Sequence, residues 1–449
     1  MNESTVTQHL ARRAAELQFE QLTPAAVTVA KQCLLDWIGV ALAARDDPLV
    51  RILLEERLEA GLQGSAILAG RAERMALPAA VLINGAMSHA LDYDDVHEAM
   101  NGHPSVPIVP VVLGLGSALE SSGREALAAF VAGFETECRV GALCGRSHYA
   151  RGFHPTATLG TFGATAAAGR LLGLESERMT MALGIAGTQA AGLKSAFGTH
   201  CKPLHAGRAA EAGLLAARLA SRGFTAHPDI LGNEQGFART QSDQFDRAAC
   251  EANPPGGFHI PATLFKYHAA CFLTHSSIEA LKQLRESHCL APADVAAVML
   301  RVSDAHLKIC NIPEPRTGLE IKFSLRMMAA LALAGVDTAN DLNYTDALTA
   351  RPDLVALRDK VTVATSPKLP GTFSEVVVTL AGGQQLVRSH DVGEPPPDLE
   401  CQWQMLEAKF RSLVAPALRA DRAQALIDAC REAERLEKIG MLLELTTTT

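Results

Sequence analysis

One short stretch of the sequence, residues 89–105, concentrates side chains that can move protons. It holds three histidines and four acids, in the order His89, Asp92, Asp94, Asp95, His97, Glu98 and His103. Imidazoles and carboxylates at this density are costly to bury unless they pair with one another or exchange protons with a substrate. The stretch therefore indicates either a catalytic site or an ordinary helix end whose acids and histidines cap and solvate a turn.

A metal site is a further alternative for this stretch. His89 and Asp92 are three residues apart, and so are Asp94 and His97, so each pair could share one face of a helix. However, the sequence contains neither a His-Glu-x-x-His nor a Cys-x-x-Cys motif, and its acids lack the spacing of a calcium loop. A metal-dependent hydro-lyase stays open as an alternative, which elemental analysis of the purified protein would test.

Four other segments place reactive side chains beside Gly, Pro or Thr near the predicted start of a helix. They are residues 152–160 with His154, residues 198–208 with Lys202, residues 266–276 with Lys266, and, more weakly, residues 321–326 with Lys322. Taken singly, each such group is more often a cap or a surface side chain. Helix N-termini attract anions, so together the segments predict a pocket for a substrate with more than one carboxylate.

The elements that must position these groups are mainly helices. The pattern is helical up to about residue 250, with proline in the first turn at Thr23-Pro24 and Leu77-Pro78. Small residues recur at helical spacing in 160–169 and 206–213, which favours helices that pack backbone to backbone. Apolar helical periodicity returns from residue 398 to about residue 445.

Strand patterns interrupt the helices in the second half of the chain. They lie at 295–303, 360–365 and 374–388, and the last contains a Gly382-Gly383 turn that predicts a hairpin. The segments 254–257 and 395–397, rich in Pro and Gly, read as linkers. We therefore expect a mainly α fold in which residues 1–257 and 398–449 form a large all-helical domain and residues 258–397 form a smaller inserted α+β domain.

Composition indicates which partners and which cellular location to expect. The 449 residues carry 41 basic and 49 acidic side chains, for a formal net charge of -8, without a basic run, so we expect no nucleic-acid partner. Apolar runs are soon broken by a charge or a proline, so we expect no membrane partner either. The N-terminus lacks signal-peptide order and the ten cysteines are scattered, which favours a cytoplasmic protein.

The polar segments resemble those of the MmgE/PrpD family, which includes 2-methylcitrate dehydratase, cis-aconitate decarboxylase and iminodisuccinate epimerase. The matching stretches, in order along most of the chain, are 89–95 with 103–105, 152–156, 202–208, and 266–275. The resemblance implies a helical domain built from both ends of the chain with an α+β domain between them, a homodimer, and chemistry without a metal or organic cofactor.

The same resemblance implies that Asp92, His103, His154, Lys202 and Lys266 line the active site. Removal of a proton beside a carboxylate builds negative charge on it, which lysine and imidazolium groups stabilise. We expect His103 to act as base and His154 as acid or anion binder, although the two roles could be reversed, and Asp92 to orient the base. Further candidates from the matching segments are Cys271 as an acid or base, and Thr156, Arg208 and His275 as substrate-binding groups.

Two departures from the family bear on the reaction. Val96 stands where the decarboxylase has a threonine after the paired aspartates, and Cys271 stands where it has a histidine. Both weaken the prediction of a cis-aconitate-type decarboxylase. We therefore expect a dehydratase-type lyase of a small di- or tricarboxylate. An epimerase of a dicarboxylate such as iminodisuccinate and a non-catalytic binding paralogue stay as alternatives, and Cys271 could equally be an inert thiol.

Overall fold

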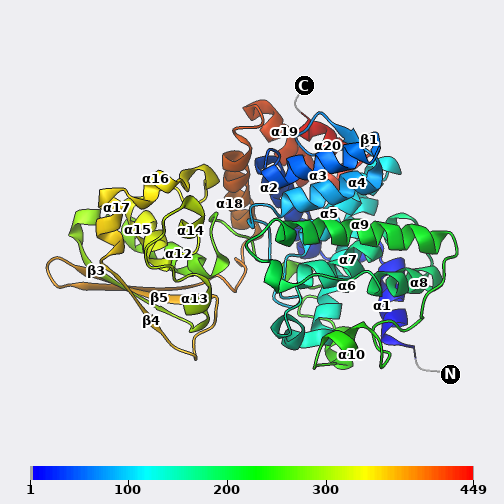
Figure 1. Ribbon diagram of the computed structural model, residues 1–449, viewed down its shortest axis with the longest axis horizontal. Helices are drawn as coiled ribbons and strands as arrows, with labels where there is room; N and C mark the ends of the chain where they lie inside the picture. Colours follow the sequence, from blue (N-terminus) through cyan, green and yellow to red (C-terminus); the bar gives the residue numbers. More distant parts are fainter. Residues whose placement is uncertain (1–3, 448–449) are drawn as a thin grey trace. The chain divides into compact units, whose positions relative to one another are not determined.

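The computed structural model describes residues 4–447, which form two compact units (Figure 1). Unit 1 comprises Met1–Phe265 and Pro397–Thr449, and unit 2 comprises Lys266–Pro396. Each unit is described by itself below. The domain boundaries that we placed after residues 257 and 397 from the sequence stay predictions.

Unit 1 is mainly helical, as expected. Its helices are α1 (Val6–Glu16), α2 (Pro24–Ala43), α3 (Pro48–Glu59), α4 (Leu77–Ser88), α5 (Ser105–Ala118), α6 (Gly123–Ala150), α7 (Pro155–Leu171), α8 (Ser176–Gly187), α9 (Cys201–Ser221), α10 (Phe237–Gln241), α11 (Arg247–Glu251), α18 (Leu399–Val414), α19 (Ala420–Arg431) and α20 (Met441–Thr446). The expectation of an all-helical unit was wrong, because β1 (Gln63–Ile67) and β2 (Arg74–Met75) pair as a small antiparallel sheet. The first three residues of β1 are exposed. The strand therefore buries few apolar residues and has no clear pattern by which the sequence could predict it.

Proline marks several helix starts in unit 1, including that of α3 at Pro48. Pro24, Pro78 and Pro155 all lie in the first turn of their helices, where no partner for a backbone N–H is needed. The prediction that Lys202 precedes its helix was wrong by two residues, because α9 already begins at Cys201. Lys202 therefore lies inside the first turn.

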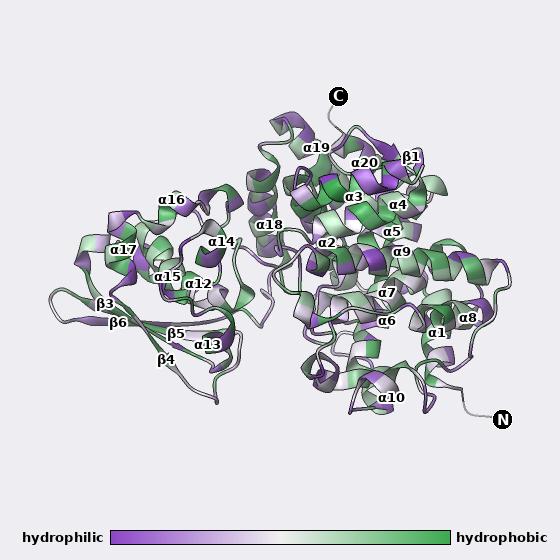
Figure 2. Ribbon diagram, in the orientation of Figure 1, coloured by the Kyte–Doolittle hydropathy of each residue, from purple (hydrophilic) through white to green (hydrophobic). Residues whose placement is uncertain are grey.

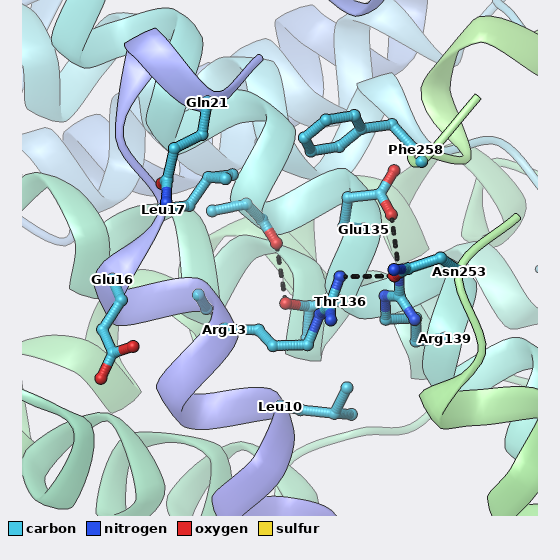
Figure 3. A pocket seen from close by; sticks show the side chains of 13 residues that line it. Leu10, Arg13, Glu16, Leu17, Gln21, Glu135, Thr136, Arg139, Asn253 and Phe258 are labelled. Atoms are coloured by element: carbon cyan, nitrogen blue, oxygen red, sulfur yellow. Dashed lines mark hydrogen bonds and ion pairs between the residues drawn. The ribbon is translucent and has the colours of Figure 1, made fainter. Parts of the chain in front are cut away.

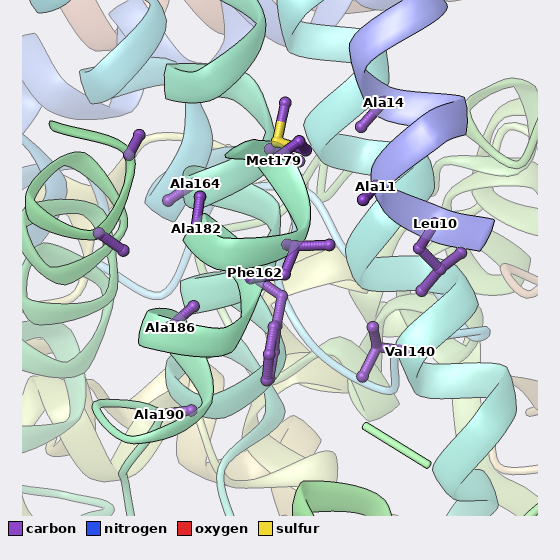
Figure 4. Packing of buried hydrophobic residues seen from close by; sticks show 14 of the residues in the cluster. Leu10, Ala11, Ala14, Val140, Phe162, Ala164, Met179, Ala182, Ala186 and Ala190 are labelled. Carbon is purple, nitrogen blue, oxygen red and sulfur yellow. The ribbon is translucent and has the colours of Figure 1, made fainter. Parts of the chain in front are cut away.

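Hydrophobic burial holds the unit together. The helices α4 and α5 are buried along nearly their whole length and are apolar on all sides (Figure 2). Around them, α1, α6, α7 and α8 share a cluster of buried residues in which Phe162 packs among small side chains such as Ala182 and Ala186 (Figure 4). Cores of this kind depend on close approach of the backbones, because alanine fills little space.

Glycine permits a close approach of two helix backbones, α4 and α9. A β-carbon added at Gly207 of α9 would lie 2.2 Å from the carbonyl oxygen of Leu82 in α4, and one at Gly85 would lie 2.9 Å from the Cα of Gly207. Neither position can hold a larger residue unless the helices separate. The small-residue stripe predicted at 206–213 thus sets the distance between the two helices.

The helix α2 is long and apolar enough, by length and composition alone, to cross a membrane, which the sequence interpretation had not expected of any segment. Most of it is buried in the core of unit 1. It also carries Asp36, whose Oδ1 lies 2.6 Å from Nζ of Lys409 on α18. The same Nζ donates to the Tyr93 carbonyl oxygen at 2.8 Å, so one buried ion pair ties α2 and the C-terminal segment to the 89–105 stretch.

Unit 2 combines helices with one four-stranded sheet of order β4-β3-β5-β6. Its elements are α12 (His275–His288), β3 (Val295–Val302), α13 (Ala305–Ile309), α14 (Gly318–Ile321), α15 (Leu325–Ala334), α16 (Asp346–Thr349), α17 (Pro352–Arg358), β4 (Val361–Thr365), β5 (Phe373–Leu380) and β6 (Gln385–Asp391). The strands β3 and β4 are parallel, and β5 and β6 form the predicted hairpin. The helices α12 and α15 pack on the sheet.

The close contact between α4 and α9 allows us to predict how a substitution there changes stability. Gly207→Ala should lower the unfolding midpoint by several degrees, because overpacking at a rigid backbone costs about 1–3 kcal/mol and exceeds the helix-propensity gain of alanine. The matched control is Gly114→Ala in α5, whose β-carbon would meet only side-chain atoms, of Leu77 and Val81, at 3.2 Å. Equal midpoints for the two variants in a thermal melt would contradict this account of the packing.

Candidate active site

Three segments of unit 1 carry the polar groups that the sequence singled out. The connection from α4 to α5 carries the 89–105 cluster, the start of α7 carries His154 and Thr156, and the start of α9 carries Lys202. The helix α9 packs against both α4 and α7. Helix starts that are distant in sequence are therefore brought to one place.

Asp94 lies beneath two histidines of this cluster. Its Oδ1 is 2.9 Å from Nδ1 of His89, and its Oδ2 is 2.9 Å from Nδ1 of His103. The Nδ1 atom of His103 also lies 3.0 Å from the Asp95 carbonyl oxygen, to which it donates a hydrogen bond, and its interaction with Asp94 is mainly electrostatic. A carbonyl oxygen only accepts, so Nδ1 of His103 carries a proton and a neutral His103 presents Nε2 as its basic nitrogen.

Burial and charge set the protonation states of Asp94 and His89. Burial alone would raise the pKa of the Asp94 carboxyl, but the His103 and His89 imidazoles together hold it well below its usual range. Burial lowers the pKa of His89 to about 4 in spite of Asp94. At neutral pH the pair is therefore a carboxylate with a neutral imidazole, and the buried Nε2 of His89 has no hydrogen-bond partner among residues 4–447.

Asp92 and Lys202 face His103 from the other side. Nζ of Lys202 lies 2.7 Å from Oδ1 of Asp92, which in turn lies 3.4 Å from Nε2 of His103. Asp92 adopts a left-handed backbone conformation with φ of 52°, which aspartate tolerates better than most residues and which is frequent at functional sites. The Asp92 side chain is 38 % exposed, whereas those of Lys202 and His103 are 15 % and 12 % exposed. The three groups thus form a partly open, charged rim above Asp94.

The backbone near His103 is fixed by two further side chains. The His103 N–H donates to Oγ1 of Thr156 at 3.0 Å, so Thr156 positions the base and is itself fully buried. Asp95 caps the start of α5 by accepting from the backbone N–H of Ser105 at 3.2 Å and from its hydroxyl. Burial raises the pKa of the Asp95 carboxyl to about 7, although the hydrogen bonds from Ser105 oppose that shift.

His154 is the residue before Pro155 at the start of α7, as predicted. Its Nδ1 lies 3.0 Å from Nδ1 of His205, so one of the two imidazoles donates to the other. Its ring stacks on that of His89 at 6.0 Å between centroids. Burial, followed by the charges of His89 and Lys202, lowers the pKa of His154, so its imidazole is neutral at physiological pH.

Other residues of the predicted segments lie elsewhere or play structural parts. His97 is buried, and its Nε2 donates to the carbonyl oxygen of His259 at 3.0 Å, while Glu98 is exposed. Arg208 is exposed and forms its ion pair with Glu211. Its assignment as a substrate-binding group stays a prediction.

Three predicted site residues belong to unit 2. Lys266 and His275 are buried and Cys271 is half-buried. His275 begins α12, and its Nε2 donates to the Ala270 carbonyl oxygen at 3.2 Å. Burial lowers its pKa well below the usual range, so it is a neutral group. The place of these residues in a common site stays a prediction, whereas Lys322 forms an ion pair with Asp341 inside unit 2.

The cluster also has the residue types of a metal site. Ligand-type atoms of His89, Asp92, Asp94 and His103 lie within 4.8 Å of one another. One observation counts against a cation there: the Lys202 ammonium already pairs with the Asp92 carboxylate. We interpret the group as a hydrogen-bonded network that includes its own cation.

Sequence interpretation undervalued three members of this network. Asp94, His89 and His205 lie in segments that match the family, but no individual role was predicted for any of them from the sequence. His205 lies three residues after Lys202 and so shares a face of α9 with it, which is a signal that could have found it. The five-residue spacing of His89 and Asp94 across a turn gives no such periodic signal.

Comparisons with known proteins identify relatives over nearly the whole chain. The family model of the MmgE/PrpD N-terminal domain matches residues 8–249, and that of the C-terminal domain matches residues 268–433. The cis-aconitate decarboxylase of Homo sapiens is 27% identical over 465 residues, which cover 98% of this chain and 94% of that protein. The cis-aconitate decarboxylase of Aspergillus terreus is 26% identical over 474 residues, which cover 98% and 96%.

The low pKa of Asp94 makes a prediction about pH and stability. A carboxyl group whose pKa is lower in the folded than in the unfolded protein stabilises the fold at pH values above its unfolded pKa, which is about 3.9 for aspartate. This stabilisation is lost as the pH falls from there through the pKa of the folded state. Asp94→Asn should therefore be less stable than the wild type at pH 7, by on the order of 1–3 kcal/mol. The difference should shrink below about pH 4.

Denaturant titrations at several pH values measure this difference directly. Glu98→Gln is the matched control, because Glu98 lies in the same segment and is exposed. An Asp94→Asn variant whose deficit is the same at pH 7 and at acidic pH would show that the charge of Asp94 is not what stabilises the cluster.

Proposed function

This chain belongs to the MmgE/PrpD family, and on that premise we propose that it is a lyase that dehydrates a hydroxylated, citrate-like di- or tricarboxylate to an aconitate-like acid. The observation that carries the proposal is the position of His103, whose Nδ1 is held by Asp94 and the Asp95 carbonyl while Nε2 faces Asp92 and Lys202. A base beside a lysine is what proton removal next to a carboxylate requires.

The proposed steps use only side chains of this chain. A substrate carboxylate binds to Nζ of Lys202, and Nε2 of His103 takes the proton from the adjacent carbon. Negative charge then grows on the carboxylate, where Lys202 stabilises it, and the Asp94 carboxylate stabilises the imidazolium of His103. The leaving hydroxyl takes the proton from the His103 imidazolium and departs as water. His154 is neutral and donates a hydrogen bond to the departing oxygen, and the contact between its Nδ1 and that of His205 orients its ring.

Unit 2 completes the proposal with a second cation. We assign Lys266 to a further carboxylate of the substrate and His275 to binding, on the family resemblance of the segment 266–275. Thr156 acts through the His103 backbone. We assign Arg208 to substrate binding on the family resemblance alone. The reaction needs no metal and no organic cofactor, and the enzyme works as a homodimer; these points also rest on the resemblance alone. A cytoplasmic location is proposed from the scattered cysteines.

Decarboxylation is the second candidate reaction, because the human and Aspergillus terreus relatives are named cis-aconitate decarboxylases. Val96 stands where the family's decarboxylase has a threonine, and its side chain has no hydrogen-bonding group. The backbone of Val96 pairs with that of Leu264. At Cys271 a thiol takes the place of a histidine. Both differences remove polar groups that could hold or protonate a decarboxylation intermediate, so we favour dehydration.

The epimerase and the binding paralogue rest on weaker support. A thiol opposite a histidine suits a two-base epimerase, but the Cys271 thiol is hydrogen-bonded to Cys310, and this bond, followed by burial, raises the pKa of Cys310. A paralogue without catalysis has no need to keep an imidazole pair around a buried carboxylate.

One experiment separates these reactions. Purified protein is incubated in D₂O with citrate, 2-methylcitrate, cis-aconitate or iminodisuccinate, and products are followed by proton NMR. Dehydration gives an unsaturated acid with all carboxylates retained, decarboxylation releases carbon dioxide, and epimerisation exchanges the α-proton without an unsaturated product. The proposal fails if only the second or third result is seen, or if all four acids bind without turnover.

Substitution of the two central histidines should separate catalysis from binding. His103→Gln should lower kcat by about 10² to 10⁴-fold, the usual value of a positioned base, and His154→Gln by about 10² to 10³-fold, the usual value of a hydrogen-bond donor to developing charge, both with smaller changes in KM. Lys202→Met should raise KM as well, because it removes the cation that holds the carboxylate. His200→Gln is the control, since His200 is exposed and precedes α9; comparable kcat for it and His103→Gln would refute the assigned base.

A further inference from the structure

A cavity of about 370 Å³ lies in unit 1 between α1, α6 and the loop that contains residues 253–258 (Figure 3). Its walls contain none of the groups assigned above to the candidate active site. Volumes of 300 to 1,000 Å³ are typical of small-molecule sites. Leu10, Leu17 and Phe258 give the cavity an apolar side, and Arg13 and Arg139 give it a cationic side.

The two arginines converge on one neutral oxygen. Nη2 of Arg13 donates to Oδ1 of Asn253 at 3.0 Å, and Nη2 of Arg139 donates to the same oxygen at 3.2 Å. Nη1 of Arg139 donates to the carbonyl oxygens of Cys250 and Ala252, so this guanidinium is fixed in place. Both charges are thus positioned by neutral acceptors, which hold guanidinium groups without neutralising them.

The nearest buried acid only partly compensates these charges. Oε2 of Glu135 lies 3.5 Å from Nη2 of Arg139, which is beyond a normal hydrogen bond, while its Oε1 accepts from the backbone N–H groups of His259 and Ile260. Burial raises the pKa of Glu135 to about 7, so the carboxyl is half protonated at neutral pH. Burial and then the charge of Arg139 lower the pKa of Arg13, as expected for cations without a full counter-charge.

Two buried polar atoms at the cationic side also lack a hydrogen-bond partner among the residues that the structure describes. They are Nε of Arg139, a donor, and Oε2 of Glu135. Arg139 is 1 % exposed, so the cost of an unmet donor is not relieved by bulk water. The only other acid on the wall, Glu16, is exposed.

We propose that this cavity is a second ligand site, which binds a small organic monocarboxylate with an apolar body. The carboxylate pairs with Arg13 and Arg139, and the apolar body lies along Leu10, Leu17 and Phe258. A polycarboxylate is a poor fit, because its further charges would be buried against apolar side chains without partners. The site therefore differs in ligand class from the polar site around His103, and the proposal does not depend on the reaction assigned there.

Hexanoate serves as the probe, and the full chain is titrated with it by ligand-observed NMR. We expect saturable binding with a millimolar dissociation constant, at least about tenfold tighter than hexanamide, which has the same shape without the charge. An excess of citrate should not displace it. Displacement by citrate, or equal binding of the amide, would overturn the proposal.

Two substitutions locate the site. Arg13→Gln should weaken hexanoate binding about tenfold or more, whereas Arg12→Gln, at the exposed neighbouring position of α1, should leave it unchanged. Leu17→Trp should abolish binding by filling the cavity while the unfolding midpoint stays within a few degrees of the wild type. Arg139 is left intact, because it holds two backbone carbonyls. Unchanged affinity in both Arg13→Gln and Leu17→Trp would refute the site.

Discussion

A single buried carboxylate, Asp94, is the constraint on which the polar cluster depends. It must stay ionised although it is buried, and the Nδ1 atoms of His89 and His103 on its two oxygens make that state favourable. In turn the carboxylate, with the Asp95 carbonyl, leaves Nε2 of His103 as the basic nitrogen. The backbone beside Asp94 is itself held, because Lys409 of α18 donates to the carbonyl oxygen of Tyr93. The C-terminal segment therefore supports the site without contributing to its chemistry.

The helices around the cluster can bring their N-terminal ends together because their contacts are made by the smallest residues. Gly85 and Gly207 meet between α4 and α9, and Gly213 lies against Ala164 of α7. Lys202 and His154 are 48 residues apart in the sequence. This packing places both of them near the imidazole of His89. The arrangement of these polar groups thus depends on close helix packing. Bulky side chains at the glycine positions would move Lys202 and His154 apart.

The sequence predicted what depends on local pattern. Proline placed the starts of α2, α4 and α7, and the Gly382-Gly383 pair placed the β5–β6 hairpin. The sheet β1–β2 was missed, because its exposed strand shows no alternation of polar and apolar residues. The start of α9 was placed two residues late, since Pro203 fits the third position of a helix as well as the first.

The site was predicted in part for the same reason. Asp92, His103, His154 and Lys202 carry recognisable motifs, and the structure brings them together. Asp94 was undervalued because its importance comes from a buried charge, which no spacing encodes. His205 was undervalued although its spacing from Lys202 places both on one face of α9. Arg208 shows the converse: it lies inside a motif, yet its own ion pair is with Glu211 on the surface of α9.

The central claim is that the basic Nε2 of His103, beside Lys202, removes a proton next to a carboxylate. A crystal structure with tricarballylate, a tricarboxylate that has no hydroxyl group to lose, tests it most directly. We predict one ligand carboxylate on Nζ of Lys202 and an adjacent carbon within about 3.5 Å of Nε2 of His103. Ligand bound away from His103, or a metal ion held between Asp92 and that nitrogen, would contradict the account.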